Sequence, residues 1–198
     1  MKYNKILSKK SENLSQMALS LKNQYSLADP FPHIEIDNFF STDYLDTILK
    51  EFPDLSNLKD SQNYKNQNEI KFANNDYSNF PENIKNFFDF LNSETFLNFL
   101  QIITSINEKL VGDKELSGGG LHEIKSGGLL KVHTDFNKHP TNNLDRRVNV
   151  LIYLKNTQRM NFLPINVHRP YYHQLILFCT AAIKIVSQFY AEVVLLIF

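Results

Sequence analysis

Some features common in other proteins are rare or absent in this chain of 198 residues, and each absence excludes certain classes of protein. Cys179 is the only cysteine, so an internal disulfide is excluded and a reducing, cytoplasmic location is expected. The 21 basic and 21 acidic residues cancel, so no net charge draws the chain to nucleic acid or to an anionic membrane. Residues 1–15 hold no continuous apolar run of the kind found in signal peptides. The length fits one domain with a sizeable core.

Glycine and charge are both unevenly distributed along the chain. All six glycines lie between Gly112 and Gly128, so residues 156–198 lack the residue that turns with positive φ favour most. That segment holds only four charged side chains, Arg159, Arg169, Lys184 and Glu192. Its apolar runs at 175–178 and 193–198 are too short and too interrupted to predict a membrane span.

The first part of the chain alternates predicted helices and strands. Apolar residues at near-helical spacing in 4–25 predict a marginal amphipathic helix or a loosely attached arm, which a Pro-Phe-Pro segment ends. Alternation of polar and apolar residues predicts a strand over 33–40. A helix then follows, capped by Ser41 or Thr42 and stopped by Pro53.

Residues 54–79 are polar and rich in asparagine, and we expect them to be irregular apart from a short candidate strand at 70–73. Pro81 starts a further helix, since proline is tolerated in a first helical turn, and another helix is predicted from Ser93 to about Leu110. The phenylalanines clustered on these helices are expected to pack in the core rather than to bind a cofactor, because large aromatic side chains dominate cores.

The strongest chemical signal is the segment His133-Thr134-Asp135. At the end of a strand, residues i and i+2 share one face, so the imidazole and the carboxylate can reach one metal ion. An imidazole with a carboxylate suits iron, zinc or manganese, and two histidines with one carboxylate form the non-haem Fe(II) oxygenase site. The alternative is a pair of surface loop residues that bind no metal.

The residues around this pair predict two strands joined by a loop. Gly127-Gly128 predicts a turn, 129–132 a short strand that leads to the pair, and 137–145 a polar loop. Residues 147–154 return as a second strand. Alternation places Val148, Val150 and Ile152 on one face of it and Asn149, Leu151 and Tyr153 on the other, which is the face expected to line a cavity with His133.

The run GGLLKVHTDFN, followed after the polar loop by RRVNVLIYL, resembles the 2-oxoglutarate- and Fe(II)-dependent oxygenases, most of all the branch similar to prolyl 4-hydroxylases. The run PHIEIDNFF with the helix after it also resembles the start of that fold. The resemblance implies an α+β fold, a double-stranded β-helix (jelly-roll-like) with flanking N-terminal helices. It implies His133 and Asp135 as iron ligands and Tyr153 as the cosubstrate contact. The cofactors it implies are Fe(II) and the cosubstrate 2-oxoglutarate, with ascorbate as an accessory reductant.

The resemblance extends from about Pro30 to Leu154 and stops there. It divides the chain into an N-terminal helix or arm at 1–28, the N-terminal part of an oxygenase domain at 29–155, and a divergent apolar tail at 156–198. The abrupt loss of acids and glycines in this tail indicates a truncated or frameshifted copy whose barrel is incomplete at the C-terminus.

The family completes its metal site with a second histidine far downstream, and a Lys or Arg beyond it pairs with the cosubstrate. Here the tail offers His168, Arg169 and His173, but His168 follows Asp135 by only 33 residues and Arg169 is directly adjacent to it. Ordinary polar residues without a metal are the alternative for both histidines, and no catalytic residue is assigned.

Several polar residues near the motif have two interpretations. His139 is expected to be a loop residue. His122 and Glu123 either line the pocket or, as the simpler interpretation, lie on a solvated strand face. Arg146 and Arg147 either contact substrate or acidic loops, or form exposed salt bridges.

Three functions follow from these patterns. The first is an oxygenase (hydroxylase) that acts on a protein side chain such as proline or on a small metabolite. The second is a catalytically inactive remnant that keeps half of the metal site. The third is an interaction module whose apolar C-terminal runs form an oligomer interface. No nucleic-acid or membrane partner is expected.

Overall fold

The computed structural model describes residues 3, 5–117, 119–125, 127–130, 136–154, 173–179 and 192–197. Its helices are the short 3-10 helices η1 (Lys9–Ser11) and η2 (Tyr77–Asn79) and the α-helices α1 (Leu14–Ser26), α2 (Thr42–Glu51), α3 (Glu82–Leu91) and α4 (Glu94–Thr104). Its strands are β1 (His33–Asp37), β2 (Gln62–Lys65), β3 (Glu69–Asn74), β4 (Gly120–Glu123), β5 (Leu129–Leu130), β6 (Val148–Leu154), β7 (His173–Cys179) and β8 (Glu192–Ile197).

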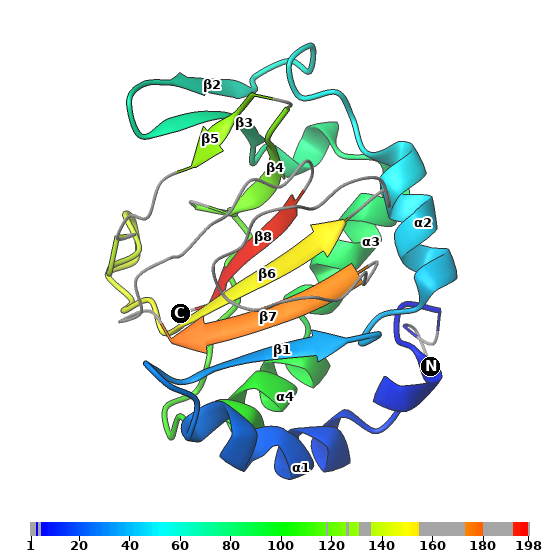
Figure 1. Ribbon diagram of the computed structural model, residues 1–198, viewed down its shortest axis with the longest axis vertical. Coiled ribbons are helices and arrows are strands. Elements are labelled where there is room, and N and C mark those ends of the chain that lie inside the picture. Colours follow the sequence, from blue (N-terminus) through cyan, green and yellow to red (C-terminus); the bar gives the residue numbers. More distant parts are fainter. Residues whose placement is uncertain are drawn as a thin grey trace.

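The described strands form one antiparallel sheet in the order β1-β7-β6-β8-β4-β3-β2, with β5 beside β3 (Figure 1). Strand β6 is an interior strand, which pairs with β7 along one edge and with β8 along the other. The two strands from the C-terminal segment therefore lie inside the sheet, each with a neighbour on both sides. A double-stranded β-helix needs a second, facing sheet, and the described strands make only one, so that fold stays a prediction.

Helices α3 and α4 lie behind the sheet in Figure 1, and a hydrophobic core rich in phenylalanine fills the space between helices and strands. The Phe39 ring, just after β1, packs against the rings of Phe96 and Phe99 on α4, with centroids 6.1 and 5.1 Å apart. Tilted and edge-on arrangements of this kind are favoured by the aromatic quadrupole. The prediction that the phenylalanines of the two helices pack in the core is confirmed by those that are fully buried, Phe87, Phe88, Phe90, Phe96 and Phe99.

Every residue of β6 is buried, on both faces of the strand. The even-numbered residues of the strand join the main hydrophobic cluster against the helices, whereas Asn149, Leu151 and Tyr153 lie outside that cluster. The predicted alternation is therefore confirmed. One face of the sheet is apolar and meets the helices, and the opposite face buries polar groups as well as Leu151.

The segment predicted to be irregular contains a β-hairpin made of β2 and β3. The predicted strand at 70–73 is confirmed as part of β3, but its partner strand is missing from the prediction. Asn66 explains the error, because its Oδ1 accepts hydrogen bonds from the backbone N–H groups of Asn68 (2.8 Å) and Glu69 (3.1 Å). Asparagine here specifies a tight turn between strands rather than an irregular loop.

Two predicted helices have different boundaries in the structure. Helix α4 ends at Thr104 rather than near Leu110, because Ser105 adopts the left-handed conformation with φ 60°. Helix α1 begins only after Asn13, whose side chain caps it. The alternative of a loosely attached arm is wrong for this helix, because its core-facing residues are buried, namely Leu14, Ala18 and Tyr25.

Two glycines around β4 are required by the backbone. Gly120 has φ +109°, and a Cβ built there would lie 2.3 Å from the Asn74 carbonyl oxygen, so β3 and β4 can approach this closely only at glycine. Gly127 has φ +82°, and the Gly128 N–H donates to the Lys125 carbonyl oxygen at 2.7 Å. The predicted turn at Gly127-Gly128 is confirmed.

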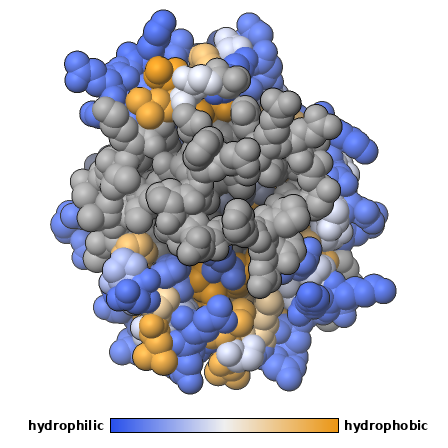
Figure 2. Space-filling model, viewed as in Figure 1, coloured by the Kyte–Doolittle hydropathy of each residue, from blue (hydrophilic) through white to orange (hydrophobic). Residues whose placement is uncertain are grey.

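Hydrophilic side chains cover much of the described surface at the upper and lower margins of the view in Figure 2. Large apolar side chains that are exposed occur on several different elements and loops: Leu19, Leu27, Ile70, Val111 and Phe136. Within the described ranges, no helix has the length and apolarity that crossing a membrane requires.

We expect Phe96→Ala to lower the free energy of unfolding by about 3–5 kcal/mol, because it empties a fully buried site between Phe39 and Phe99. Leu27→Ala is the control, since Leu27 is 82% exposed and its loss should change that free energy by less than about 0.5 kcal/mol. Urea denaturation followed by circular dichroism measures both. Equal effects of the two substitutions would contradict the assigned core.

A second prediction concerns Asp54, in the loop after α2. Lys125 Nζ donates to Asp54 Oδ1 at 2.7 Å, and Ser56 adds further hydrogen bonds, so the pKa of Asp54 is held well below its usual range. A depressed pKa means that this stabilisation is fully present above the unfolded-state pKa and is lost progressively as the pH falls from there through the lower folded-state pKa. Asp54→Asn should therefore destabilise the protein at pH 7, and its difference from wild type should shrink in acid.

Urea titrations at several pH values test this prediction. Lys125→Met removes the other partner, so the double substitution with Asp54→Asn should cost less than the sum of the two single substitutions. A difference between wild type and Asp54→Asn that stayed constant from neutral pH into the acid range would show that the ion pair does not act in this way.

Candidate functional site

The candidate site lies on the sheet face opposite the helices, where the strand register aligns polar positions. Tyr153 of β6 is paired with Glu192 of β8, and Glu192 is paired with His122 of β4. Along its other edge, β6 pairs Tyr153 with Gln174 of β7. Directly opposed residues of antiparallel strands share a face, so Tyr153 and His122 belong to one row across the sheet.

This face is polar and yet buried. Tyr153 and His122 are each 6% exposed, and Asn149 is 2% exposed. The simpler interpretation of His122, a solvated strand face, is therefore wrong, because β4 is an interior strand between β3 and β8. Burying polar groups costs free energy unless they are hydrogen-bonded, so the polar side chains on this face need partners within the protein or in a bound ligand.

The same face continues onto the β2–β3 hairpin. Ala73 is paired with His122, and Lys71 lies two residues before Ala73 on the same side of β3. The Lys71 side chain is 10% exposed, with Nζ 3.2 Å from Glu69 Oε2 and 4.9 Å from the centre of the Tyr64 ring. This buried cation is already neutralised within the hairpin.

Glu123, next to His122, has a structural contact rather than a solvated position. Its Oε2 accepts a hydrogen bond from the Leu55 N–H at 3.0 Å, and burial raises the pKa of its carboxyl. The side chain therefore ties the end of β4 to the loop after α2.

The two arginines before β6 have different environments. Arg147 forms a partly exposed ion pair, with its terminal nitrogen 3.0 Å from Glu108 Oε1. Arg146 is only 5% exposed, and its Nε donates to Asn149 Oδ1 at 2.8 Å while a terminal nitrogen donates to the Phe136 carbonyl at 3.3 Å. The predicted exposed salt bridge is confirmed for Arg147 and wrong for Arg146, because the Asn149 side chain and the Phe136 carbonyl accept hydrogen bonds from the buried guanidinium.

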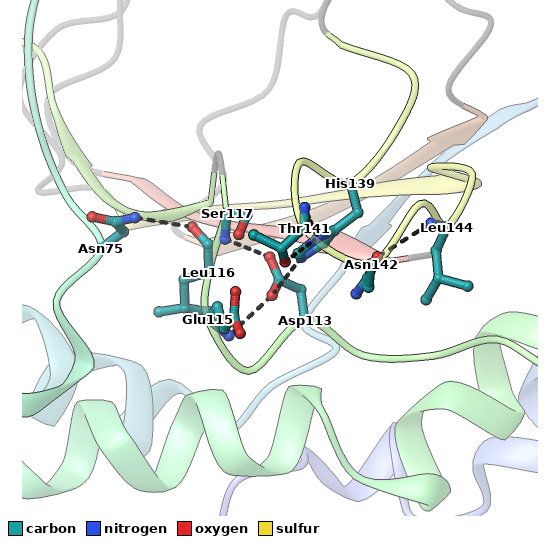
Figure 3. Close-up of polar contacts among 9 residues, drawn as sticks. All are labelled: Asn75, Asp113, Glu115, Leu116, Ser117, His139, Thr141, Asn142 and Leu144. Carbon is teal, nitrogen blue, oxygen red and sulfur yellow. Dashed lines mark hydrogen bonds and ion pairs between the residues drawn. The ribbon is translucent and has the colours of Figure 1, made fainter.

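Figure 3 shows a second buried contact, between the loop after α4 and the loop before β6. The His139 Nε2 lies 3.4 Å from Asp113 Oδ1, and both side chains are 2% exposed. The Asp113 carboxylate also accepts from the backbone N–H of Glu115 at 2.9 Å and from that of Ser117. His139 does lie in a loop, as predicted, but it is a buried anchor of that loop.

The hydrogen bonds of His139 indicate its tautomer. Thr141 N–H, which can only donate, points to Nδ1 at 3.3 Å, so Nδ1 acts as the acceptor. The ring proton then lies on Nε2 and is donated to Asp113. Sequence reasoning misses Asp113, because it lies 26 residues from His139 and no local pattern links the two.

The predicted metal ligands His133 and Asp135 lie outside the described residues, as do His168 and Arg169. His173 is the first residue of β7, where its backbone pairs with Leu154. Among the residues that are described, no group of three or more His, Cys, Asp or Glu side chains is arranged to hold a metal ion. The assignment of His133 and Asp135 therefore stays a prediction, while Tyr153 is shown to be buried on the polar face.

A cavity of about 1050 Å³ lies away from this face, between the N-terminal segment and helices α3 and α4. Apolar residues such as Leu7, Leu14 and Phe90 line it together with the acidic Glu12 and Glu94. Among the described residues that line the cavity there is no histidine, cysteine, lysine or arginine, so we do not assign the chemistry to it.

Comparison with known proteins adds no family assignment. No protein family model matches the chain, and no curated protein is significantly similar to it.

The His139–Asp113 contact leads to a prediction about stability. His139→Ala should lower the free energy of unfolding by about 1–3 kcal/mol, because it removes a buried partner of the Asp113 carboxylate. Lys138→Ala is the neighbouring control: it removes an exposed ion pair with Asp145 and an exposed hydrogen bond to Asn143 and should cost about 0–1 kcal/mol. Chemical denaturation gives both values, and equal losses would contradict the anchor.

Proposed function

We propose that the chain is a domain of the Fe(II)- and 2-oxoglutarate-dependent oxygenase class, close to the prolyl 4-hydroxylase-like branch. In this proposal His133 and Asp135 hold the metal and Tyr153 contacts the cosubstrate. The observation that carries the proposal is the buried polar face of the sheet, on which Tyr153 shares a row with His122. Such a face supports a site that needs polar groups kept out of water.

The available donor set fits the metal. One imidazole and one carboxylate, two residues apart, are ligand types that Fe(II) accepts. Fe(II) and 2-oxoglutarate, when bound, would supply the oxidation of a substrate C–H bond by O2, which also oxidises the cosubstrate to succinate and CO2, with ascorbate as the accessory reductant. The chain would hold the metal through His133 and Asp135 and donate a hydrogen bond from the Tyr153 hydroxyl to a cosubstrate carboxylate. The buried face around Tyr153 would exclude water from that contact.

The second candidate is a catalytically inactive member of the same class. It is favoured by the sequence after Lys155, which lacks a distal histidine and a following cation at the family's spacing. Metal binding would persist in such a protein, with lower affinity, since affinity depends on ligand number and on the groups that orient the ligands.

An interaction module that assembles through the apolar C-terminal runs has less support. The run at 175–178 lies in β7, which is paired with β1 and β6, and the described part of the run at 193–198 lies in β8, which is paired with β6 throughout and with β4 over Glu192–Val194, so most of the backbone of both runs is already engaged within the sheet. For the first two candidates we propose a cytoplasmic location and, as substrate, either a protein side chain such as proline or a small metabolite.

The metal assignment is tested by anaerobic Fe(II) titration in a calorimeter. His133→Ala and Asp135→Ala should each weaken binding at least about tenfold, since each removes one of only two predicted protein ligands. His33→Ala, in the edge strand β1, is a matched histidine control and should leave the isotherm unchanged. Unchanged binding in all three variants would contradict the assignment of His133 and Asp135 as metal ligands.

An activity assay distinguishes the active oxygenase from the catalytically inactive member of the same class. We expect negligible succinate release from the purified chain with Fe(II), ascorbate, 2-oxoglutarate and O2, because two protein ligands orient the reactants poorly. Robust release that His168→Ala or His173→Ala abolishes would contradict this expectation and would show that the C-terminal segment completes the site.

A further inference from the structure

Figure 3 shows a hydroxyl, an imidazole and a carboxylate joined by consecutive contacts. Thr141 Oγ1 lies 3.2 Å from His139 Nδ1, and His139 Nε2 lies 3.4 Å from Asp113 Oδ1. A hydroxyl next to a base, with a carboxylate on the far nitrogen of that base, is the arrangement that activates nucleophiles in acyl-transfer enzymes. None of these three residues is among those proposed to contact the metal or the cosubstrate.

The imidazole and its carboxylate are held in place below the surface. Both side chains are 2% exposed, and Asp113 also accepts hydrogen bonds from the backbone N–H groups of Glu115 and Ser117. Since His139 Nδ1 is an acceptor, it is the ring nitrogen that can take a proton. The Asp113 carboxylate then faces the Nε2–H of the imidazolium and stabilises its positive charge.

The hydroxyl, in contrast, lies at the surface. Thr141 is exposed, as are its neighbours Pro140 and Asn142. The His139 N–H donates to the Leu144 carbonyl at 2.8 Å, which closes the backbone of this turn, and Pro140 restricts it further. A molecule from solvent can therefore reach the hydroxyl, while the base behind it stays in a fixed position.

We propose that Thr141, His139 and Asp113 form a second site, at which the Thr141 hydroxyl accepts an acyl group. Thr141 Oγ1 bonds to the acyl carbon while its proton moves to His139 Nδ1. The bond between the acyl carbon and the leaving oxygen then breaks, and that oxygen takes the proton from Nδ1. The products are an acyl-threonine and a free alcohol or phenol, with no change of oxidation state.

The contacts of Nδ1 restrict the acyl donors. The Thr141 N–H also donates to Nδ1, at 3.3 Å, so the hydroxyl shares the nitrogen lone pair with a backbone donor. Removal of the hydroxyl proton is then only partly assisted, which suffices where the leaving group departs easily. We therefore expect activated esters such as aryl esters to react, and alkyl esters and amides to remain unchanged.

The aryl ester p-nitrophenyl acetate tests the site in the whole native chain, with no metal and no 2-oxoglutarate added. Trypsin releases residues 139–146 as one peptide, in which Thr141 carries the only hydroxyl side chain. Mass spectrometry should show that this peptide is acetylated at least about tenfold faster than Thr47, because general-base assistance contributes about 100- to 10,000-fold in enzymes. Thr47 is the control in the same sample, since its hydroxyl donates to the Asp43 carbonyl at 3.0 Å.

Four substitutions assign the roles. Thr141→Val should abolish acetylation of the peptide, whereas Thr141→Ser should retain it, because serine keeps the hydroxyl. His139→Gln keeps an N–H donor for Asp113 but has no nitrogen that can take a proton, so it should lower the rate to that of Thr47. Thr47→Val removes a hydroxyl without an imidazole partner and should leave acetylation of the peptide unchanged.

Two results would overturn the proposal. The first is acetylation of the peptide in wild type no faster than that of Thr47, a comparison that needs no variant. The second is equal acetylation in wild type and in His139→Gln, since the contacts would then be those of a local turn only. Far-ultraviolet circular dichroism shows whether His139→Gln is folded; if it is not, the ratio of Thr141 to Thr47 acetylation in wild type decides alone.

Discussion

All seven residues of the interior strand β6 are buried, and the rest of the structure depends on which groups pack against each of its two faces. On the helix side the solution is apolar, and fully buried phenylalanines from α3 and α4 fill the space. On the other side Asn149 and Tyr153 are polar, and a buried polar group needs a partner. Arg146 provides that partner for Asn149, so the demand of one strand also fixes the loop that precedes it.

Much of the fold follows from local patterns in the sequence. The alternation in β6, the capping of α2 by Ser41 and the Gly127-Gly128 turn are each set by residues close together in the chain, and each is found in the structure. Such features are predictable because strand alternation, helix capping and a positive φ each favour particular residue types at fixed positions.

The features that the sequence does not predict depend on residues far apart in the chain, or on a single residue that changes the local secondary structure. Asn66 turns an apparent loop into a hairpin, and Ser105 ends α4 early by its backbone conformation. From the sequence His122 is expected to be exposed, but in the structure its strand lies between two others. The partner of His139 is fixed by packing alone, since Asp113 belongs to a loop on another part of the chain.

The strand order also has a consequence for how the protein is made. Strand β1 forms from the first forty residues, yet its partner in the sheet is β7, with His33 opposite Phe178. Strand β4 likewise meets β8 only when Glu192 to Val194 are available. During synthesis these early strands leave the ribosome long before their neighbours exist, and pairings between distant segments are slow to form. The edges of these early strands therefore stay unpaired until the C-terminal segments emerge, and unpaired strand edges favour aggregation.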